Sequence, residues 1–156
     1  MQIDATAKRI RVRRWILILF SGLLASCAGV EVSPEMQCPQ PRFTGKAPES
    51  IYNLVNPLSF SDESISNGRA IYESQAQPPC RLCHGIKGDG QGPLATQFAV
   101  PPRNFSCAET VNGIPDGQLF WIIQNGSPGT SMPGFNHLND KQIWELVTYL
   151  RQLAIM

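Results

Sequence analysis

The sequence predicts an all-α domain over residues 61–156, with three main helices and long loops. Helical patterns occupy about residues 61–74, 116–125 and 139–153. The segments between them are rich in glycine and proline, which favour turns and loops. No run alternates polar and apolar residues for long enough to indicate a strand. The whole chain has 156 residues, a length typical of one domain.

The first helix is expected to begin after Ser61, a favoured N-cap residue. Asp62 and Glu63 then lie in the first turn, where the helix dipole favours negative charge. Gly68 and Tyr72 share one face at helical spacing. A glycine inside a helix costs up to about 1 kcal/mol relative to alanine. Gly68 is therefore either merely tolerated or marks the close approach of another helix, which we place at the C-terminus.

The other two helices also carry boundary signals. Asp116 follows Pro115 and opens the second helix, and Gly126 is a residue type common just after a helix end. Asn139 is the expected N-cap of the C-terminal helix, with Asp140 in its first turn. The core-facing stripe of that helix follows the 3–4–7 spacing and consists of Ile143, Leu146, Val147, Leu150 and Leu153.

The N-terminus has the form of an export signal. A basic stretch at residues 8–14 precedes an apolar run at 15–25, which is short for a membrane span of roughly 20 residues. The residues from Leu24 to Cys27 resemble the bacterial lipobox. This resemblance implies a lipoprotein signal peptide over residues 1–26, cleavage before Cys27 and a lipid on its sulfur. The alternative is a general secretory signal or an uncleaved anchor, with Cys27 incidental.

The lipobox resemblance also implies a place in the cell. Residue 28 is alanine rather than aspartate, which by the sorting rule of such lipoproteins favours the outer membrane. We therefore expect a lipid-anchored protein of the bacterial cell envelope that faces the periplasm. Structural disulfides are permitted in that compartment.

Residues 27–60 are expected to form a lipidated, proline-rich tether in front of the domain. Five prolines lie between residues 28 and 60, and apolar periodicity is weak, which favours irregular and partly extended chain. We expect segment 39–60 to lie on the domain surface. Its contacts would come from Phe43, Ile51, Tyr52, Leu54 and Leu58.

The charge balance excludes one class of partner. The formal net charge is +1, but residues 1–26 hold five basic residues and one acidic residue. Without that stretch, 8 basic and 11 acidic residues remain. A mildly acidic protein has no electrostatic basis for binding nucleic acid.

The chemistry of the chain is concentrated in the segment from Cys80 to His84. Two cysteines separated by two residues, with a histidine directly after, form the attachment motif of c-type haem. Each sulfur can form a thioether with one haem vinyl group, and His84 then lies beneath the iron. A zinc half-site would need further ligands, and His137 is the only other histidine. A dithiol redox pair would sit in a βαβ pattern, which is absent.

Residues 61–156 resemble class I monohaem cytochrome c. The resemblance covers the whole C-terminal domain in the family's order and leaves out residues 28–60. The matching segments are Gly68 with Tyr72, Cys80 to Gly85, Gly88 to Leu94, Pro101 to Arg103, Asp116 to Gly126, Thr130 to Phe135, and Trp144 with Tyr149 to Arg151. The resemblance implies one covalent haem c, attached through Cys80 and Cys83, with His84 as the proximal iron ligand.

We assign Met132 as the second axial ligand. It lies in a loop rich in proline and glycine rather than on an apolar stripe, and it matches the family's Thr-x-Met-Pro-Gly pattern. His137 is the rival ligand, five residues further on. The resemblance also implies that the carbonyl of Pro93 accepts the ring N–H of His84, which would fix the ring.

Other residues are expected around the haem. Arg103 either compensates a propionate charge or is a solvated loop arginine. Trp121 either bonds a propionate or packs in the wall, and packing is favoured. The remaining wall candidates are Leu94, Phe98, Phe105 and Phe135.

The last two cysteines are Cys38 and Cys107. With Cys27 lipidated and the haem motif occupied, they are the only thiols left in an oxidising compartment. We expect a disulfide that staples the tether to the domain. Two unpaired thiols, or pairing with another chain, are the alternatives.

These features predict a membrane-anchored electron carrier rather than an enzyme. With both axial positions filled, the iron has no site for a small-molecule substrate. The expected partners are a redox donor and a redox acceptor that dock transiently, at the low end of interface size. One alternative is a fixed cytochrome subunit of a multisubunit oxidoreductase. The other is an enzyme or gas sensor with a labile Met132 ligand.

Overall fold

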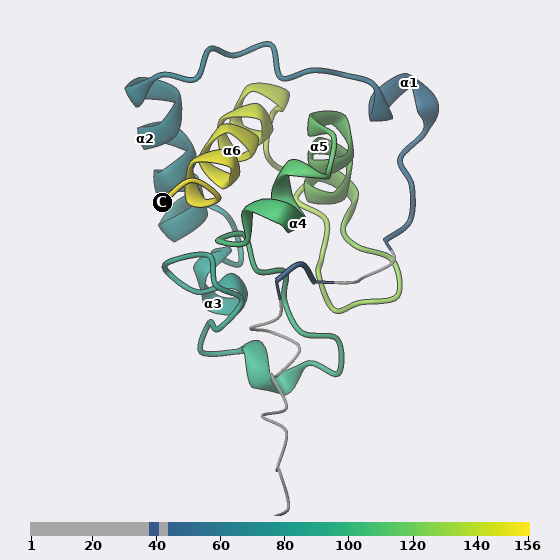
Figure 1. The fold of residues 1–156 in the computed structure, drawn as a ribbon, viewed down its shortest axis with the longest axis vertical. Coiled ribbons are helices and arrows are strands. Elements are labelled where there is room, and N and C mark those ends of the chain that lie inside the picture. Colours follow the sequence, from purple (N-terminus) through teal and green to yellow (C-terminus); the bar gives the residue numbers. More distant parts are fainter. Residues whose placement is uncertain (1–37, 41–43) are drawn as a thin grey trace, which may run out of the picture. The chain divides into compact units, whose positions relative to one another are not determined.

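The computed structural model describes residues 38–40 and 44–156. These residues form helices and loops and contain no strand, so the predicted all-α class is confirmed. Figure 1 shows the helices in sequence colours. They are α1 (Glu49–Tyr52), α2 (Asp62–Ala70), η1 (Ile71–Gln75), α3 (Arg81–His84), η2 (Ala95–Gln97), α4 (Ala108–Asn112), α5 (Asp116–Asn125) and α6 (Asp140–Leu153).

All three main helices are present where the sequence predicts them. Ser61 caps α2 by accepting a hydrogen bond from the Ser64 N–H. The expected helix to residue 74 is α-helical only as far as Ala70. Over Ile71–Gln75 it widens into a π-helical turn, in which the Ala76 N–H reaches back to the Ile71 carbonyl.

Helix α6 is the centre of the core. Asn139 and Gln142 form a reciprocal capping box at its start, which satisfies two N–H groups that the helix leaves free. The predicted apolar stripe is buried: each of its five residues is at most 4% exposed. The helix lies between α2 and α5 (Figure 1).

Helices α2 and α6 meet at Gly68. A Cβ atom at Gly68 would lie 2.1 Å from the backbone oxygen of Glu145 and 2.9 Å from the Cβ of Tyr149. Next to it, the Asn67 amide donates to the Glu145 carboxylate at 2.9 Å. The glycine is therefore required by a close helix crossing, the second of the two interpretations that the sequence allows.

Tyr72 connects this core to the haem motif. Its ring meets the Tyr149 ring edge to face, with centroids 5.3 Å apart, and its hydroxyl donates to the Gly85 carbonyl at 2.7 Å. Gly85 directly follows His84. The buried hydroxyl thus fixes the backbone at the end of the motif.

We expect the stability of the protein to fall above pH 10, in part because of Tyr72. Burial raises the pKa of this hydroxyl above its ordinary value of about 10. Below pH 10 the phenol is protonated in both states and contributes no pH dependence. Above pH 10 the unfolded chain releases the proton and the folded chain does not. The free energy of unfolding then falls by about 1.4 kcal/mol per pH unit for this group.

Tyr72→Phe tests this source of alkaline instability. At pH 8 the variant should lose about 1 kcal/mol with the hydrogen bond. Between pH 10 and pH 11 its stability should decline less steeply than that of the wild type. Denaturant unfolding at pH 8, 10 and 11 measures both effects, and equal slopes would contradict the role given to Tyr72.

The described part of the tether lies on the domain. Ile51 and Leu58 pack against the core, as expected, while Leu54 is 44% exposed. The Gln118 side chain in α5 accepts from the Ala47 N–H and donates to the Gly45 carbonyl, both at 2.8 Å. Phe43 lies outside the described residues, as do Cys27 and the expected signal peptide. Within the described ranges, no helix is long and apolar enough to cross a bilayer.

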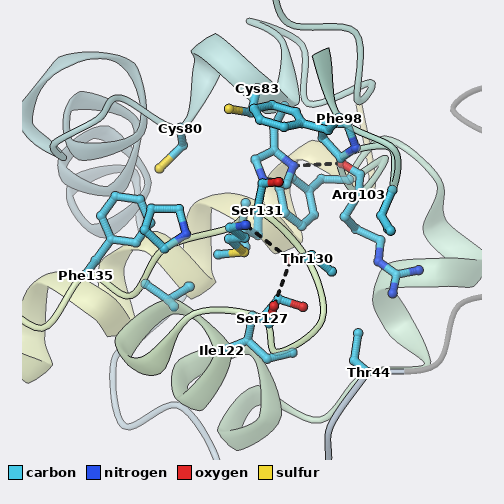
Figure 2. Close-up of a pocket in the computed structure, with 18 of the residues that line it drawn as sticks. Thr44, Cys80, Cys83, Phe98, Arg103, Ile122, Ser127, Thr130, Ser131 and Phe135 are labelled. Atoms are coloured by element: carbon cyan, nitrogen blue, oxygen red, sulfur yellow. Dashed lines mark hydrogen bonds between the residues drawn. The ribbon is translucent and has the colours of Figure 1, made fainter. Parts of the chain in front are cut away.

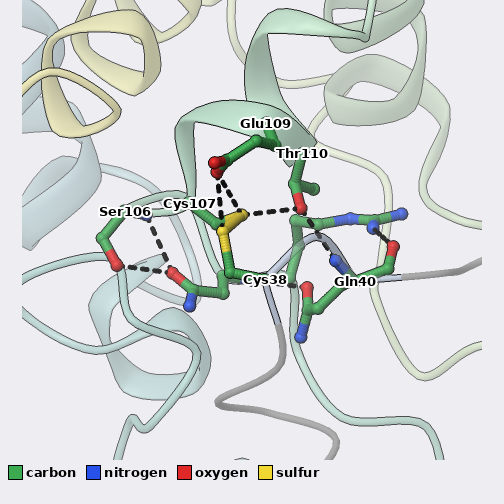
Figure 3. The surroundings of a disulfide bond; sticks show 8 residues. Cys38, Gln40, Ser106, Cys107, Glu109 and Thr110 are labelled. Atoms are coloured by element: carbon green, nitrogen blue, oxygen red, sulfur yellow. Dashed lines mark hydrogen bonds between the residues drawn. A yellow bond between two sulfur atoms is a disulfide. The ribbon is translucent and has the colours of Figure 1, made fainter.

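The tether is also held covalently. Cys38 and Cys107 are joined in a disulfide that spans 69 residues of sequence, with Cα atoms 5.6 Å apart. Figure 3 shows its surroundings, where the Glu109 carboxylate and the Thr110 hydroxyl lie beside the sulfur atoms. The predicted pairing is therefore the one that the structure contains.

Candidate haem site

The haem motif lies at a short helix. Cys80 is the N-cap residue of α3, and Cys83 lies three positions later, so both thiols occur on one face. Gly85 ends the helix with φ +81°, a left-handed conformation that favours glycine. A Cβ there would also lie 2.2 Å from a carboxylate oxygen of Asp89. The chain thus turns sharply after His84.

An apolar cavity opens beside α3. It encloses about 110 Å³, and it is partly open to solvent. Cys80, Cys83, His84 and Met132 all line it. Figure 2 shows Cys80 and Cys83 at the top of the view, with Ile122 and Ser127 across the cavity at the bottom.

His84 is held in one orientation. Its Nδ1 lies 2.9 Å from the Arg103 carbonyl oxygen. A carbonyl can only accept, so Nδ1 carries the proton and Nε2 keeps the lone pair that a metal needs. The ring also stacks on Phe105, with centroids 4.6 Å apart. His84 is thus oriented as a metal ligand.

The acceptor of the His84 hydrogen bond corrects one expectation. The predicted acceptor was the Pro93 carbonyl, but the structure gives this role to Arg103, ten residues further along the chain. Pro93 is exposed and does not line the cavity. The reason is the path of the loop after α3: Gly92 and Leu94 donate to the Cys83 and Leu82 carbonyls, which holds that loop against the back of the helix.

Met132 occupies a tightly held loop. The Thr130 hydroxyl donates to the Ser127 carbonyl at 2.8 Å and accepts from the Met132 N–H at 3.2 Å. The Met132 carbonyl accepts from the Ser127 N–H. At Gly126, with φ +85°, a Cβ would lie 2.8 Å from that same carbonyl. His137, the rival ligand, is exposed and does not line the cavity.

The expected wall is only partly correct. Phe98, Arg103, Phe105 and Phe135 line the cavity, whereas Leu94 and Trp121 do not. Trp121 is half-buried on another face of α5. Helix α5 contributes Leu119, Ile122 and Ile123, which the i, i+3, i+4 spacing places on one face of the helix. Other wall residues not singled out in advance are Thr44, Pro78, Pro79, Val100, Pro101, Pro102, Ile114 and Leu150.

The structure excludes one of the two expected roles of Arg103. Arg103 is buried and lines the cavity, so it is not a solvated loop residue. Its guanidinium donates to the backbone carbonyl of Gln40 at 3.2 Å. The side chain thus connects the cavity to the tether.

The cysteines are suited to covalent attachment. Both are free thiols, although a disulfide forms elsewhere in the chain. Burial raises the pKa of Cys80 to about 12 and also raises that of Cys83. Each sulfur is therefore a neutral thiol until a thioether replaces its S–H. Apolar walls, two thiols, an oriented imidazole and a thioether side chain together fit a covalently bound haem.

Comparison with known proteins decides the family. A family profile described as "Cytochrome c" matches residues 65–154, more than half of the chain. The chain belongs to the cytochrome c family. Membership implies a covalent haem c and a role in electron transfer.

Individual relatives agree with this assignment. Cytochrome c55X of Stutzerimonas stutzeri is 30% identical over 90 residues, which are 57% of this chain and 70% of that protein. A chain of the Kuenenia stuttgartiensis reducing HAO-like protein complex (Kustc0457/Kustc0458) is similar in structure, with a TM-score of 0.56 and 29% identity. The match covers 65% of this chain and 48% of the solved one, so this cytochrome spans about half the length of that structure.

Proposed function

We propose that this cytochrome is a membrane-anchored carrier of single electrons, with one haem c ligated by His84 and Met132. The observation that carries the proposal is the common cavity of four side chains: two thiols, an imidazole and a thioether. Met132 comes from a loop 48 residues beyond His84, and its backbone is fixed on both sides. These features support Met132 as a ligand rather than a core methionine.

The chain's own residues suit this role. When bound, the haem supplies one Fe(III)/Fe(II) couple, whose potential a thioether ligand raises. His84 is held by a hydrogen bond and a stacked ring, so the same ligation is available in both oxidation states. The mostly apolar wall disfavours water at the site. Little rearrangement is then needed when an electron arrives or leaves, which favours electron transfer over substrate chemistry.

The anchor rests on the sequence around Cys27. A diacylglycerol with a further acyl chain would hold the protein firmly, since each buried CH₂ contributes roughly 0.8 kcal/mol. We place the protein in the bacterial envelope, on the outer membrane and facing the periplasm. There it would receive electrons from one redox protein and pass them to another.

Replacing Cys27 with serine should release the protein from the membrane. The wild type is expected in the membrane pellet after a high-salt wash, because acyl chains rather than charges hold it. Cys27→Ser should lose the lipid mass and lose most of its membrane retention, with the haem spectrum unchanged. Cys38→Ser is the matched control and should remain in the pellet. Equal retention of Cys27→Ser and the wild type would contradict the lipid anchor.

A second candidate is a fixed subunit of a larger oxidoreductase. The solved structure that this chain resembles is itself a protein complex. Co-purification from native membranes distinguishes the two candidates. A free carrier should elute alone at moderate salt, whereas a stoichiometric complex that survives salt would favour the subunit.

A further inference from the structure

Gln40 is a buried side chain that bridges the two peptide groups on either side of Arg103. It is 8% exposed. Its Nε2 donates to the Pro102 carbonyl at 3.4 Å, and its Oε1 accepts from the Asn104 N–H at 2.8 Å. The amide therefore binds this loop much as a neighbouring strand would.

The bridged loop is the one that orients His84. The Arg103 carbonyl belongs to the same peptide group as the Asn104 N–H, and it accepts the His84 Nδ1–H. The Arg103 guanidinium donates in turn to the Gln40 carbonyl at 3.2 Å. Gln40 thus makes three hydrogen bonds to residues 102–104. Arg103 connects Gln40 to the imidazole, because its carbonyl bonds the His84 ring.

The loop needs such a partner. Pro101 and Pro102 have no N–H to donate, and Pro102, Arg103 and Asn104 are all buried. Buried backbone groups require hydrogen bonds. The Phe105 N–H donates to the Gly88 carbonyl. The Gln40 amide bonds the Pro102 carbonyl and the Asn104 N–H.

The disulfide fixes the backbone of Gln40. Cys38 lies two residues before it and is bonded to Cys107, four residues beyond Arg103. The Gln40 N–H also donates to the Thr110 hydroxyl at 2.9 Å, as Figure 3 shows. Residues 38–40 lie outside the 65–154 region that matches the family, so this support is an addition to the family's domain.

We propose that Gln40 is a positioning residue for His84, held in place by the Cys38–Cys107 disulfide, and that the tether thereby tunes the reduction potential. This inference rests on the proposed role of His84 as an iron ligand. The hydrogen bond from Nδ1–H increases the basicity of the ligating imidazole, which favours Fe(III). A looser Arg103 carbonyl weakens that bond, so losing Gln40 shifts the equilibrium toward Fe(II) and raises the potential.

The test compares Gln40→Met with Gln118→Met in the holoprotein. Both replacements keep volume and remove a buried amide that makes two hydrogen bonds to loop backbone. The Gln118 amide bonds the backbone of Gly45 and Ala47 rather than the loop around Arg103. We expect Gln40→Met to accelerate exchange of the His84 ring N–H in the ferrous protein, measured by NMR, by about tenfold. Its Fe(III)/Fe(II) equilibrium should shift several-fold toward Fe(II), where tenfold equals about 59 mV.

The results separate positioning from mere stability. The inference is supported if Gln40→Met shows faster exchange of the His84 ring N–H and a raised reduction potential, and Gln118→Met shows neither change. Equal behaviour of the two variants overturns it. If Gln40→Met yields no holoprotein, the ring N–H exchange of ferrous wild type is compared before and after a small dithiol reduces the disulfide. Faster exchange supports the inference, and unchanged exchange overturns it.

One further spectrum separates this inference from the proposed function. Ferric wild type should show His84 ring protons with the large NMR shifts of an iron ligand. If they are absent, the ligand assignment fails, and the inference fails with it. If they are present and Gln40→Met leaves exchange and potential unchanged, only the role of Gln40 is overturned.

Discussion

Met132→Ala is expected to abolish the weak long-wavelength absorption band of thioether-ligated ferric haem. Among the described residues, Met132 is the only methionine that lines the cavity, and its loop holds it there through Ser127 and Thr130. Alanine cannot reach the iron, so water or another weak ligand would take the sixth position. Because a thioether raises the potential, its loss should lower the potential by on the order of 0.1 V or more, within the roughly 0.8 V range set by axial ligands.

A spectrum and a redox titration of the ferric and ferrous variants measure both effects. Ser131→Ala, at the neighbouring exposed position in the same loop, is the matched control and should keep the band. If Met132→Ala retains the band and the wild-type potential, another residue is the ligand. His137→Ala would then be the next variant to examine.

Gly68→Ala is expected to destabilise the holoprotein by about 3–5 kcal/mol, at the upper end for a single substitution. The added methyl would lie 2.1 Å from the Glu145 backbone oxygen. Neither a side-chain rotation nor a small shift relieves a clash with helix backbone. Helices α2 and α6 would have to separate, and the packing of Tyr72 on Tyr149 would loosen with them.

Thermal and denaturant unfolding of the ferric protein provide the measurement. For a domain of this size the midpoint should drop by more than about 10 °C. Gly113→Ala is the control. There φ is −76° and the nearest atom to an added Cβ is 3.4 Å away, so the change should stay within about 1 kcal/mol. Similar losses in the two variants would contradict the importance of the helix crossing.

The sequence was most informative where the signal is local. Asn139 with Gln142 forms the cap of α6, and Asp116 after Pro115 opens α5 as predicted. The spacing of Cys80, Cys83 and His84 needs no tertiary information, since one helical turn places the thiols together. For Gly68 the sequence left mere tolerance and a helix crossing both open, and the contact with the Glu145 backbone decides for the crossing.

Features set by loop paths were not predictable in the same way. The family resemblance implied that the carbonyl of Pro93, nine residues after His84, accepts the ring N–H of His84. The accepting carbonyl belongs to Arg103 because the intervening loop returns along the back of α3. Trp121 was an expected wall residue, but helix geometry turns Ile122 and Ile123 to the cavity instead. Gln40 carried no motif, and its role emerges only from the contacts that the folded tether makes.

A spectroelectrochemical titration of the wild-type holoprotein at neutral pH tests the central claim most directly. The account predicts one covalent haem per chain and a single one-electron Nernst wave. The thioether band should appear with oxidation and vanish with reduction, in step with that wave. A ferric spectrum without this band at neutral pH, or two separate redox waves, would contradict a carrier with one haem held between His84 and Met132.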